Sequence, residues 1–313
     1  MNLIEAAGLS KCYDVKAKPQ IYAVNNVDLT IRQGESVGLV GESGSGKSTL
    51  GKLLLQLEKA TSGTVHYRGN RISAYSFNEM RSIRKHMQMI FQNSGNLFNP
   101  YFNVKQIILE PIDNYSRESE AEKERRVVEI LDRVGLDRSY LTRFGHELSG
   151  GQRQRVGIAR ALVLHPEFVV CDEAVSSLDY VIRNQVLKLL MELKEQFGLT
   201  YLYISHDLSS VRKICDRVLV MYMGHIVEIL PRIDENVLHP YTQALMGAIL
   251  DSNPRNRQKR KPLFKATDEQ RAPDQGCIFQ HRCLYAKPEC GVLKPKLENV
   301  DGSHFVACHL HNK

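Results

Sequence analysis

Short apolar runs that end in polar clusters recur along the chain, and three of them predict buried strands: Ser36–Val40, Phe168–Cys171 and Tyr201–Ile204. Continuous apolar runs of this length are typical of parallel strands covered on both faces. Apolar residues at helical spacing follow the first two runs, namely Leu50, Leu53, Leu54 and Leu57, then Val186, Leu189, Leu190 and Leu193. The pattern predicts strand-loop-helix units of an α/β fold, which binds ligands at the carboxyl ends of its strands.

The pattern changes twice further along the chain. Between Ser82 and His165 it becomes charged and helical, as in Glu120–Val134, and predicts a helical insertion. Residues 251–270 are polar and basic without either hydrophobic period, which predicts a linker. We therefore expect a main domain over residues 1–250, with a helical part at about 82–165, and a small extension over residues 251–313.

Composition narrows the cellular setting. No apolar run approaches the roughly 18 to 20 residues of a membrane-spanning helix, and the N-terminal residues lack the pattern of a secretory signal. We therefore expect a cytosolic protein whose seven cysteines are not disulfide-bonded. The net charge of +7 comes from basic residues interleaved with acids, so we expect a solvated basic surface and no nucleic-acid partner.

A glycine-rich loop follows the first predicted strand and fits G-x-x-x-x-G-K-[ST], the phosphate-binding loop. Its glycines let the backbone close around a phosphate chain and aim N–H groups at the oxygens. Lys47 is expected to reach the terminal phosphates and Ser48 to bind Mg²⁺, while the helix near Thr49 adds its positive dipole end. The loop consists of Gly41, Glu42, Ser43, Gly44, Ser45, Gly46, Lys47 and Ser48.

Two carboxylates, Asp172 and Glu173, follow the second predicted strand. Phosphoryl transfer needs an acid that holds Mg²⁺ and can use a second one that polarises water. We assign the metal to Asp172 and the water to Glu173. This assignment depends on the other motifs, because hydrophobic strands that end in acids are common.

About twenty residues before the paired acids stands Leu148-Ser149-Gly150-Gly151-Gln152, a segment that could simply cap a helix through its serine. Together with the phosphate loop it resembles the nucleotide-binding subunit of ABC transporters. The resemblance covers roughly residues 4 to 250. It implies a P-loop NTPase fold, with a RecA-like core, an antiparallel β subdomain and the helical insertion, plus a small C-terminal appendage that contains cysteines. It also implies that Ser149 to Gln152 meet a γ-phosphate bound on a partner subunit.

Other family positions match one by one. Gln92 resembles the glutamine that contacts Mg²⁺ or water, Asp179 belongs to a Ser-Leu-Asp segment like the D-loop, and His206 resembles the switch histidine of the γ-phosphate. Tyr13 is the best candidate to stack on adenine, with Tyr22 as the alternative. The family usually has proline at the position of Ala174 and often alanine at Ser177, which does not remove a catalytic group.

The segment Leu238–Leu245 resembles a hallmark of the oligopeptide/dipeptide importer subgroup, which also includes nickel and metallophore importers. A short cysteine-rich tail cannot build its own core, which suggests a metal staple. Some members carry a [4Fe-4S] cluster on this pattern; zinc prefers closer cysteine pairs, and unligated thiols are the remaining alternative. The tail cysteines are Cys277, Cys283, Cys290 and Cys308.

The resemblance implies an ATPase at the cytoplasmic face of the cell membrane that powers import of oligopeptides or dipeptides, with nickel or a metallophore as the alternative cargo. It implies a second homologous ATPase subunit in a heterodimer, two transmembrane permease subunits and an extracytoplasmic substrate-binding protein. A soluble ABC ATPase acting on ribosomes or DNA is disfavoured, because the chain has one cassette and no extended heptads. An exporter ATPase is disfavoured by the tail and by the absence of a fused membrane domain.

Overall fold

The computed structural model describes residues 1–13, 21–92, 98–233, 236–247, 273 and 275–311 and divides into two compact units. Unit 1 comprises Met1–Ile4, Thr30–Ser36 and His66–Ser205, and unit 2 comprises Glu5–Leu29, Val37–Val65 and His206–Lys313. The border passes through four strands, which are β1 (Asn2–Cys12), β2 (Tyr22–Arg32), β3 (Ser36–Val40) and β4 (Ser62–Tyr67). The predicted linker at 251–270, and the predicted domain boundary beside it, lie outside the described residues.

Unit 1 contains three parallel strands in the order β6 (Met87–Ile90), β7 (Phe168–Asp172) and β8 (Thr200–Ile204). All of β8 is buried, and β7 is buried up to its final aspartate. Two of the predicted strands are thereby confirmed. Their apolar runs are continuous because both faces of these strands are buried.

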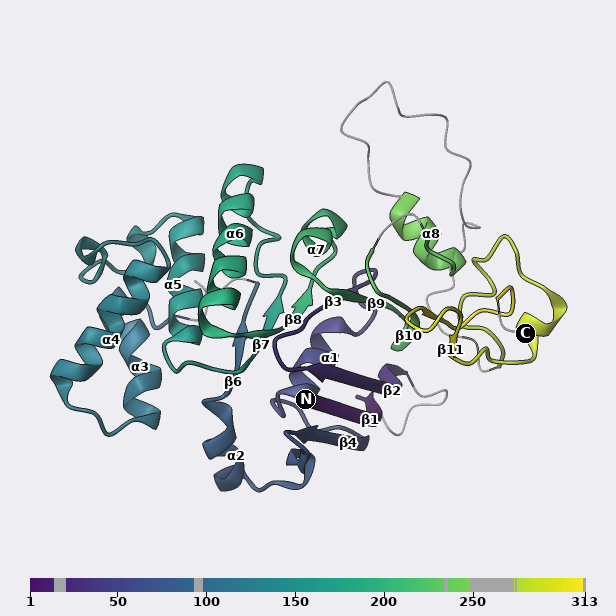
Figure 1. Cartoon of the computed structure of the whole chain (residues 1–313), viewed down its shortest axis with the longest axis horizontal. Coiled ribbons are helices and arrows are strands. Elements are labelled where there is room, and N and C mark those ends of the chain that lie inside the picture. Colours follow the sequence, from purple (N-terminus) through teal and green to yellow (C-terminus); the bar gives the residue numbers. More distant parts are fainter. Residues whose placement is uncertain (14–20, 93–97, 234–235, 248–272, 274, 312–313) are drawn as a thin grey trace. The chain divides into compact units, whose positions relative to one another are not determined.

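The helices of unit 1 are α2 (Phe77–Arg84), α3 (Val104–Tyr115), α4 (Glu120–Arg133), α5 (Gly150–Leu162) and α6 (Tyr180–Phe197). Helices α3, α4 and α5 pack against one another (Figure 1). The predicted helix at Glu120–Val134 is α4, and its apolar residues are buried. The region predicted as a helical insertion, about 82–165, contains strand β6 as well as the helices. That strand has only four residues, and its pairing with Phe168–Cys171 rather than any sequence period determines it.

Local sequence signals explain where these helices begin. Four of them start with a capping box, in which a polar side chain and the residue three positions later bond each other's backbone N–H groups. The first members are Ser76, Asn103, Ser119 and Ser149. Short 3₁₀ turns lie at Ile72–Ala74, Arg138–Tyr140 and Gly145–Glu147, and the two-residue strand β5 (Asn70–Arg71) pairs with the end of β4.

Unit 2 contains portions of two sheets. In one, β2, β1 and β4 are neighbours in that order. In the other, β3 runs parallel to β9 (Arg217–Tyr222), which pairs antiparallel with β10 (His225–Leu230). Two short tail strands, β12 (Phe305–Val306) and then β11 (Glu298–Asn299), extend this sheet from β10. The tail is therefore joined to the sheet by backbone pairing.

The helices of unit 2 are α1 (Lys47–Leu54), α7 (Leu208–Ile214) and α8 (Pro240–Gly247), with a 3₁₀ turn at Pro288–Gly291. Leu50, Leu53 and Leu54 of α1 are fully buried, as predicted. Leu57 was expected on the same face, but it is 49% exposed, because α1 ends at Leu54 and Gln56 turns into the left-handed region with φ +53°. Helix α7 packs closely on β3, since a Cβ at Gly38 would lie 2.8 Å from Val211.

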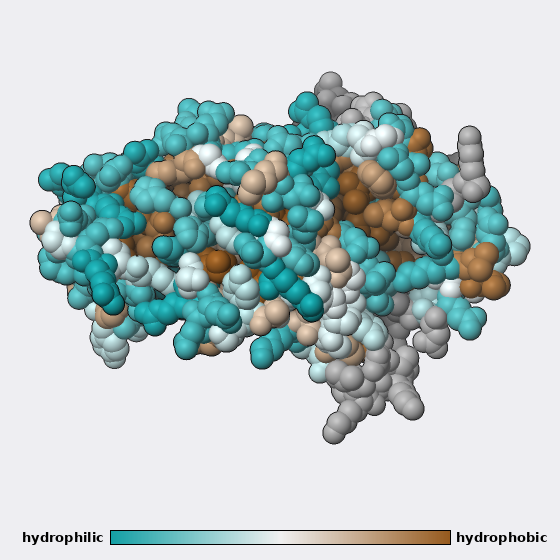
Figure 2. Space-filling view, turned by 60° about the horizontal axis from the view of Figure 1, so that its bottom comes forward, coloured by the Kyte–Doolittle hydropathy of each residue, from teal (hydrophilic) through white to brown (hydrophobic). Residues whose placement is uncertain are grey.

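The surface is mostly polar, as expected for a chain whose apolar residues are buried. On the face drawn in Figure 2, hydrophilic side chains predominate and the apolar ones gather mainly in recessed places. Within the part of the chain that the structure describes, no helix has both the length and the hydropathy needed to cross a bilayer.

Candidate nucleotide site

The phosphate-loop sequence forms the connection between β3 and α1 in unit 2. Gly46 is the N-cap of α1 with φ +104°, and a Cβ there would lie 1.9 Å from the carbonyl oxygen of Ala23. A Cβ at Gly41 would lie 2.1 Å from the carbonyl oxygen of Met221. Only glycine fits these two positions, because the neighbouring backbone comes too close for any side chain. The loop is thus held tightly against β2 and β9.

Lys47 lies inside this loop and is only 6% exposed. Its ammonium group donates hydrogen bonds to the carbonyl oxygens of Gly41, at 2.9 Å, and Glu42, at 2.8 Å. Ser48 and Thr49 follow in the first turn of α1 and are partly buried, whereas Ser43 and Gly44 are exposed at the tip of the loop. A fixed cation at a helix N-terminus suits a chain of phosphates.

Tyr13 and His206 belong to the same unit. Tyr13 follows β1 and is 62% exposed. Its hydroxyl lies 3.4 Å from the Thr49 hydroxyl and donates to the Glu58 carboxylate at 2.7 Å. The predicted adenine platform therefore lies beside the first turn of α1. His206 is exposed and directly precedes Asp207, which caps α7 by accepting the N–H of Ser209 at 3.0 Å.

The paired acids stand at the carboxyl end of β7 in unit 1, as predicted. Glu173 has φ +47°, and its backbone N–H donates to the carbonyl oxygen of Ile204 at 3.0 Å, which fixes the sharp exit from the strand. The Gln92 amide donates to the Glu173 carboxylate and to the Ser176 hydroxyl, both at 3.2 Å. Asp172 is half-buried beside this group. Sequence reasoning missed Ser176, although it lies only three residues after Glu173.

The Ser149–Gln152 segment forms the N-terminus of α5. The Ser149 hydroxyl accepts the N–H of Gln152 at 3.3 Å, and the Gln152 amide oxygen accepts the N–H of Ser149 at 2.8 Å. A Cβ at Gly151 would lie 2.6 Å from Ile182 of α6, so the glycine allows close helix packing, whereas Gly150 is less constrained. The helix-cap interpretation of this segment is confirmed, and it leaves the predicted phosphate contact open.

Asp179 has a comparable structural role in unit 1. Its carboxylate accepts the backbone N–H groups of Val181 and Ile182, both at 3.1 Å, and so begins α6. Each unit thus holds some of the residues predicted to bind or hydrolyse the nucleotide, close to a strand end or a loop. The assembly of these parts around one Mg²⁺–nucleotide, with Ser48, Gln92 and Asp172 on the metal, stays a prediction.

The four tail cysteines are all buried and border one small cavity. Backbone N–H groups point at their sulfurs: those of Tyr285 and Lys287 donate to Cys283 at 3.3 Å and to Cys290 at 3.4 Å. Burial raises the pKa of both the Cys277 and the Cys308 thiols to about 11.

Among the described residues, however, no three His, Cys, Asp or Glu side chains are close enough to hold one metal ion. This arrangement supports neither the predicted [4Fe-4S] cluster nor the zinc alternative, so the metal staple stays a prediction.

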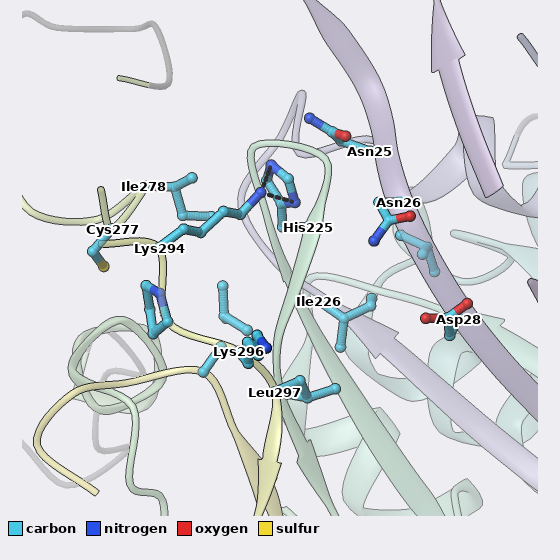
Figure 3. Close-up of a pocket in the computed structure, with 14 residues that line it drawn as sticks. Asn25, Asn26, Asp28, His225, Ile226, Cys277, Ile278, Lys294, Lys296 and Leu297 are labelled. Atoms are coloured by element: carbon cyan, nitrogen blue, oxygen red, sulfur yellow. Dashed lines mark hydrogen bonds between the residues drawn. The ribbon is translucent and has the colours of Figure 1, made fainter. Parts of the chain in front are cut away.

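A larger cavity of about 540 Å³ lies between β2, β10 and the tail (Figure 3). Asn25, Asn26 and Asp28 contribute polar groups, and the Lys294 ammonium lies 3.3 Å from both ring nitrogens of His225. Burial, together with the Lys294 charge, lowers the pKa of His225 to about 4. Of the predicted site residues only Cys277 borders this cavity, so it is separate from the phosphate loop.

Two family models match the chain. One, described as "ABC transporter", matches residues 24–176, which include the phosphate loop, the Ser149–Gln152 segment and the paired acids. The other, described as "Oligopeptide/dipeptide transporter, C-terminal region", matches residues 227–290. The second match begins on β10 and extends into the cysteine tail.

Whole-chain relatives and solved structures agree with these matches. The chain is 44% identical to the oligopeptide transport ATP-binding protein AppF of Bacillus subtilis, over 93% of this chain and 90% of that protein. It is 40% identical to the probable peptide ABC transporter ATP-binding protein y4tS of Sinorhizobium fredii, over 98% of this chain and 90% of that protein.

Among solved structures, the dimeric ATP-binding cassette MJ0796 bound to ADP and Pi is 28% identical, with a TM-score of 0.68 over 74% of this chain and all of that one. The protein cbiO1 of Clostridium perfringens, part of an ABC transporter complex, is 27% identical, with a TM-score of 0.66 over 74% of this chain and 88% of that one. On these grounds the chain belongs to the ATP-binding proteins of ABC transporters, in their oligopeptide/dipeptide branch.

Proposed function

We propose that this chain hydrolyses ATP to power an ABC importer of oligopeptides or dipeptides. The observation that supports this proposal most is a phosphate loop with closely packed glycines and a buried lysine. It occurs on a chain whose relatives over nearly the whole length are named as oligopeptide or peptide transport ATP-binding proteins. No finding favours nickel or a metallophore over peptide.

The residues divide the chemistry as follows. The loop amides and Lys47 bind the phosphates, and Tyr13 stacks on the base. Ser48, Gln92 and Asp172 would hold Mg²⁺, which neutralises charge on the phosphates when bound.

Glu173 orients and polarises the attacking water, and the bond from Gln92 supports its carboxylate in that position. His206 holds the γ-phosphate. In this mechanism the protein acts mainly by positioning the reacting groups and stabilising their charge, and it forms no covalent bond itself.

Two subunits would complete each site. In this proposal Ser149 to Gln152 of one subunit approach the nucleotide bound on the other, with the N-terminus of α5 directed at the γ-phosphate. A dimeric assembly is known for the similar cassette MJ0796. The partner is a second, homologous ATPase, and closure of the pair moves two transmembrane permeases that receive cargo from an extracytoplasmic binding protein. The chain would then lie peripherally on the cytoplasmic face of the membrane.

We also propose that the four tail cysteines hold a [4Fe-4S] cluster, because four buried thiols with N–H donors border one cavity. When bound, the group would staple a segment that has few apolar residues of its own. Anaerobic purification followed by iron and sulfide analysis tests this. About four irons and four sulfides per chain are expected, whereas metal-free protein with four titratable tail thiols would reject the cluster.

Cargo is best tested in cells. A strain that lacks the gene for this chain should lose uptake of labelled di- to hexapeptides and regain it with the wild-type gene, but not with Lys47→Ala. Nickel uptake measured in the same strains is the control. Loss of nickel uptake with normal peptide uptake would contradict the peptide assignment and favour the alternative cargo.

A further inference from the structure

Two side chains from the C-terminal part of unit 2 contact the second residue of the phosphate loop. The Arg282 guanidinium donates two hydrogen bonds to the Glu42 carboxylate, one to each oxygen and both at 2.9 Å. The hydroxyl of Tyr241 accepts the backbone N–H of Glu42 at 2.8 Å. Paired bonds between a guanidinium and a carboxylate fix orientation as well as distance. Glu42 is therefore held at both its side chain and its backbone.

Both contacting groups are themselves fixed by packing. Phe279 is 1% exposed. Its ring packs edge-on against Tyr222, with centroids 5.3 Å apart, and at a tilt of 60° against Tyr241, with centroids 5.6 Å apart. The Arg282 guanidinium lies 5.7 Å from the ring centroids of both Tyr222 and Phe279. An arginine placed over aromatic rings loses little further freedom when it binds a carboxylate. The Glu42 carboxylate in turn raises the pKa of Arg282.

The tail that carries Arg282 is joined to the sheet at a second place. Glu228 of β10 is fully buried and lies 2.7 Å from the His304 ring, beside the backbone pairing of β10 with β12. Removal of either partner of such a pair leaves the other polar group buried without this bond, which is unfavourable away from water. The tail is thus a fixed support for Arg282.

The held residue also affects the interior of the loop. The Glu42 carbonyl oxygen accepts a bond from the Lys47 ammonium at 2.8 Å and one from the Ser45 N–H at 3.2 Å. Movement of Glu42 would therefore displace both the cation and an amide that face the phosphates. Loops of this kind bind phosphate well only when their N–H groups are already aligned.

We propose that Arg282 and Tyr241 are positioning residues for ATP, which hold Glu42 so that the phosphate loop keeps its binding geometry. The inference rests on the proposed function of this loop as the ATP site. It gives the C-terminal segment a role in nucleotide affinity, in addition to any metal it holds. The affinity of the loop for ATP thus depends on the docking of the tail.

The test measures binding of a fluorescent ATP analogue to the full-length chain. Arg282→Gln should weaken binding about fivefold, since a partly exposed bidentate pair is worth about 1 kcal/mol. Arg282→Lys should recover only part of the affinity, because an ammonium cannot make the paired bonds. Tyr241→Phe keeps the aromatic packing and should weaken binding about threefold. The turnover rate of the assembled transporter at saturating ATP should stay within about twofold in these variants, because the water-activating groups are untouched.

Lys287→Gln is the matched control, because it removes one positive charge from the same tail and breaks only exposed contacts, with Glu289 at 3.6 Å and with the carbonyl oxygen of His309 at 3.5 Å. Its nucleotide affinity should equal that of the wild type. In a double-mutant cycle, Arg282→Gln combined with Glu42→Gln should bind no more weakly than the weaker single variant.

Unchanged affinity in both Arg282→Gln and Tyr241→Phe, additive losses in the cycle, or an equal loss in Lys287→Gln would each overturn the proposal. Thermal unfolding without nucleotide separates folding defects from binding, since Arg282→Lys and Tyr241→Phe should unfold within a few degrees of the wild type. A wild-type chain that binds no ATP would instead reject the proposed function of the loop itself.

Discussion

Replacement of Phe279 by alanine should release the tail from the rest of unit 2. The ring is almost completely buried and contacts three other rings, those of Tyr222, Tyr241 and His239, with centroids 5.3 to 5.9 Å away. Truncation of such a side chain removes its burial and leaves a cavity, which together cost about 3 to 5 kcal/mol. Local undocking of the tail would limit the loss to the docking free energy of the tail, and we expect about 3 kcal/mol.

Urea unfolding of the full chain without nucleotide measures this loss, and limited proteolysis of the tail reports where the chain opens. Phe279→Leu should restore about half of the stability, because it refills part of the volume. Val292→Ala, at a tail position that is 68% exposed, should change the free energy of unfolding by less than about 0.5 kcal/mol. A loss below about 1 kcal/mol for Phe279→Ala, or cleavage that begins elsewhere, would refute this account of tail docking.

Three further predictions concern single positions. Gly46→Ala should lower the free energy of unfolding by about 2 to 3 kcal/mol, because the new methyl group would clash with the Ala23 carbonyl oxygen. Thermal unfolding measures this loss, and an unchanged midpoint would argue against this loop geometry. Ser149→Ala should cost about 1 kcal/mol in urea unfolding through the lost helix cap, with Ser149→Asn close to wild type. In the folded chain the pKa of His225 is lowered to about 4, so between pH 4 and 6.5 the unfolded chain binds more protons than the folded one. The free energy of unfolding should therefore fall as the pH drops through that range, by at most about 2 kcal/mol from pH 6.5 to 5. Urea unfolding at several pH values should show that His225→Gln removes this dependence and Lys294→Met lessens it; the same slope in His225→Gln would assign it to other groups.

The sequence predicted those parts of the fold whose signal is local. The pattern of apolar residues was enough to predict β3, β7, β8 and the buried face of α6. Burial of a strand on both faces, or of a helix along one stripe, produces a pattern that can be recognised without knowing which elements lie next to it. Strand β6 gave no such signal, since its four residues are fixed by pairing with β7. The end of α1 was missed because a left-handed turn at Gln56, a residue type that rarely marks one, stops the helix.

The candidate site divides in the same way. The glycines of the phosphate loop and the serine cap of α5 follow fixed spacings, so their positions could be read directly. Ser176 became visible only when the turn after Glu173 brought its hydroxyl to Gln92. The pair Glu42–Arg282 spans 240 positions and depends on how the tail pairs with β10, which no local pattern records.

The proposed role of Glu173 is to activate the water that hydrolyses ATP on this chain. The decisive measurement is phosphate release by the purified, assembled transporter, compared between the wild type and Glu173→Gln, with nucleotide affinity measured on the same samples. In the proposed pair of ATPases this chain would supply the acid of one of two sites. We therefore expect unchanged ATP affinity and a loss of at least about half of the turnover, because a positioned base contributes about 10² to 10⁴ to the rate at its own site. A Glu173→Gln transporter that binds ATP normally and hydrolyses it at the wild-type rate would contradict the claim.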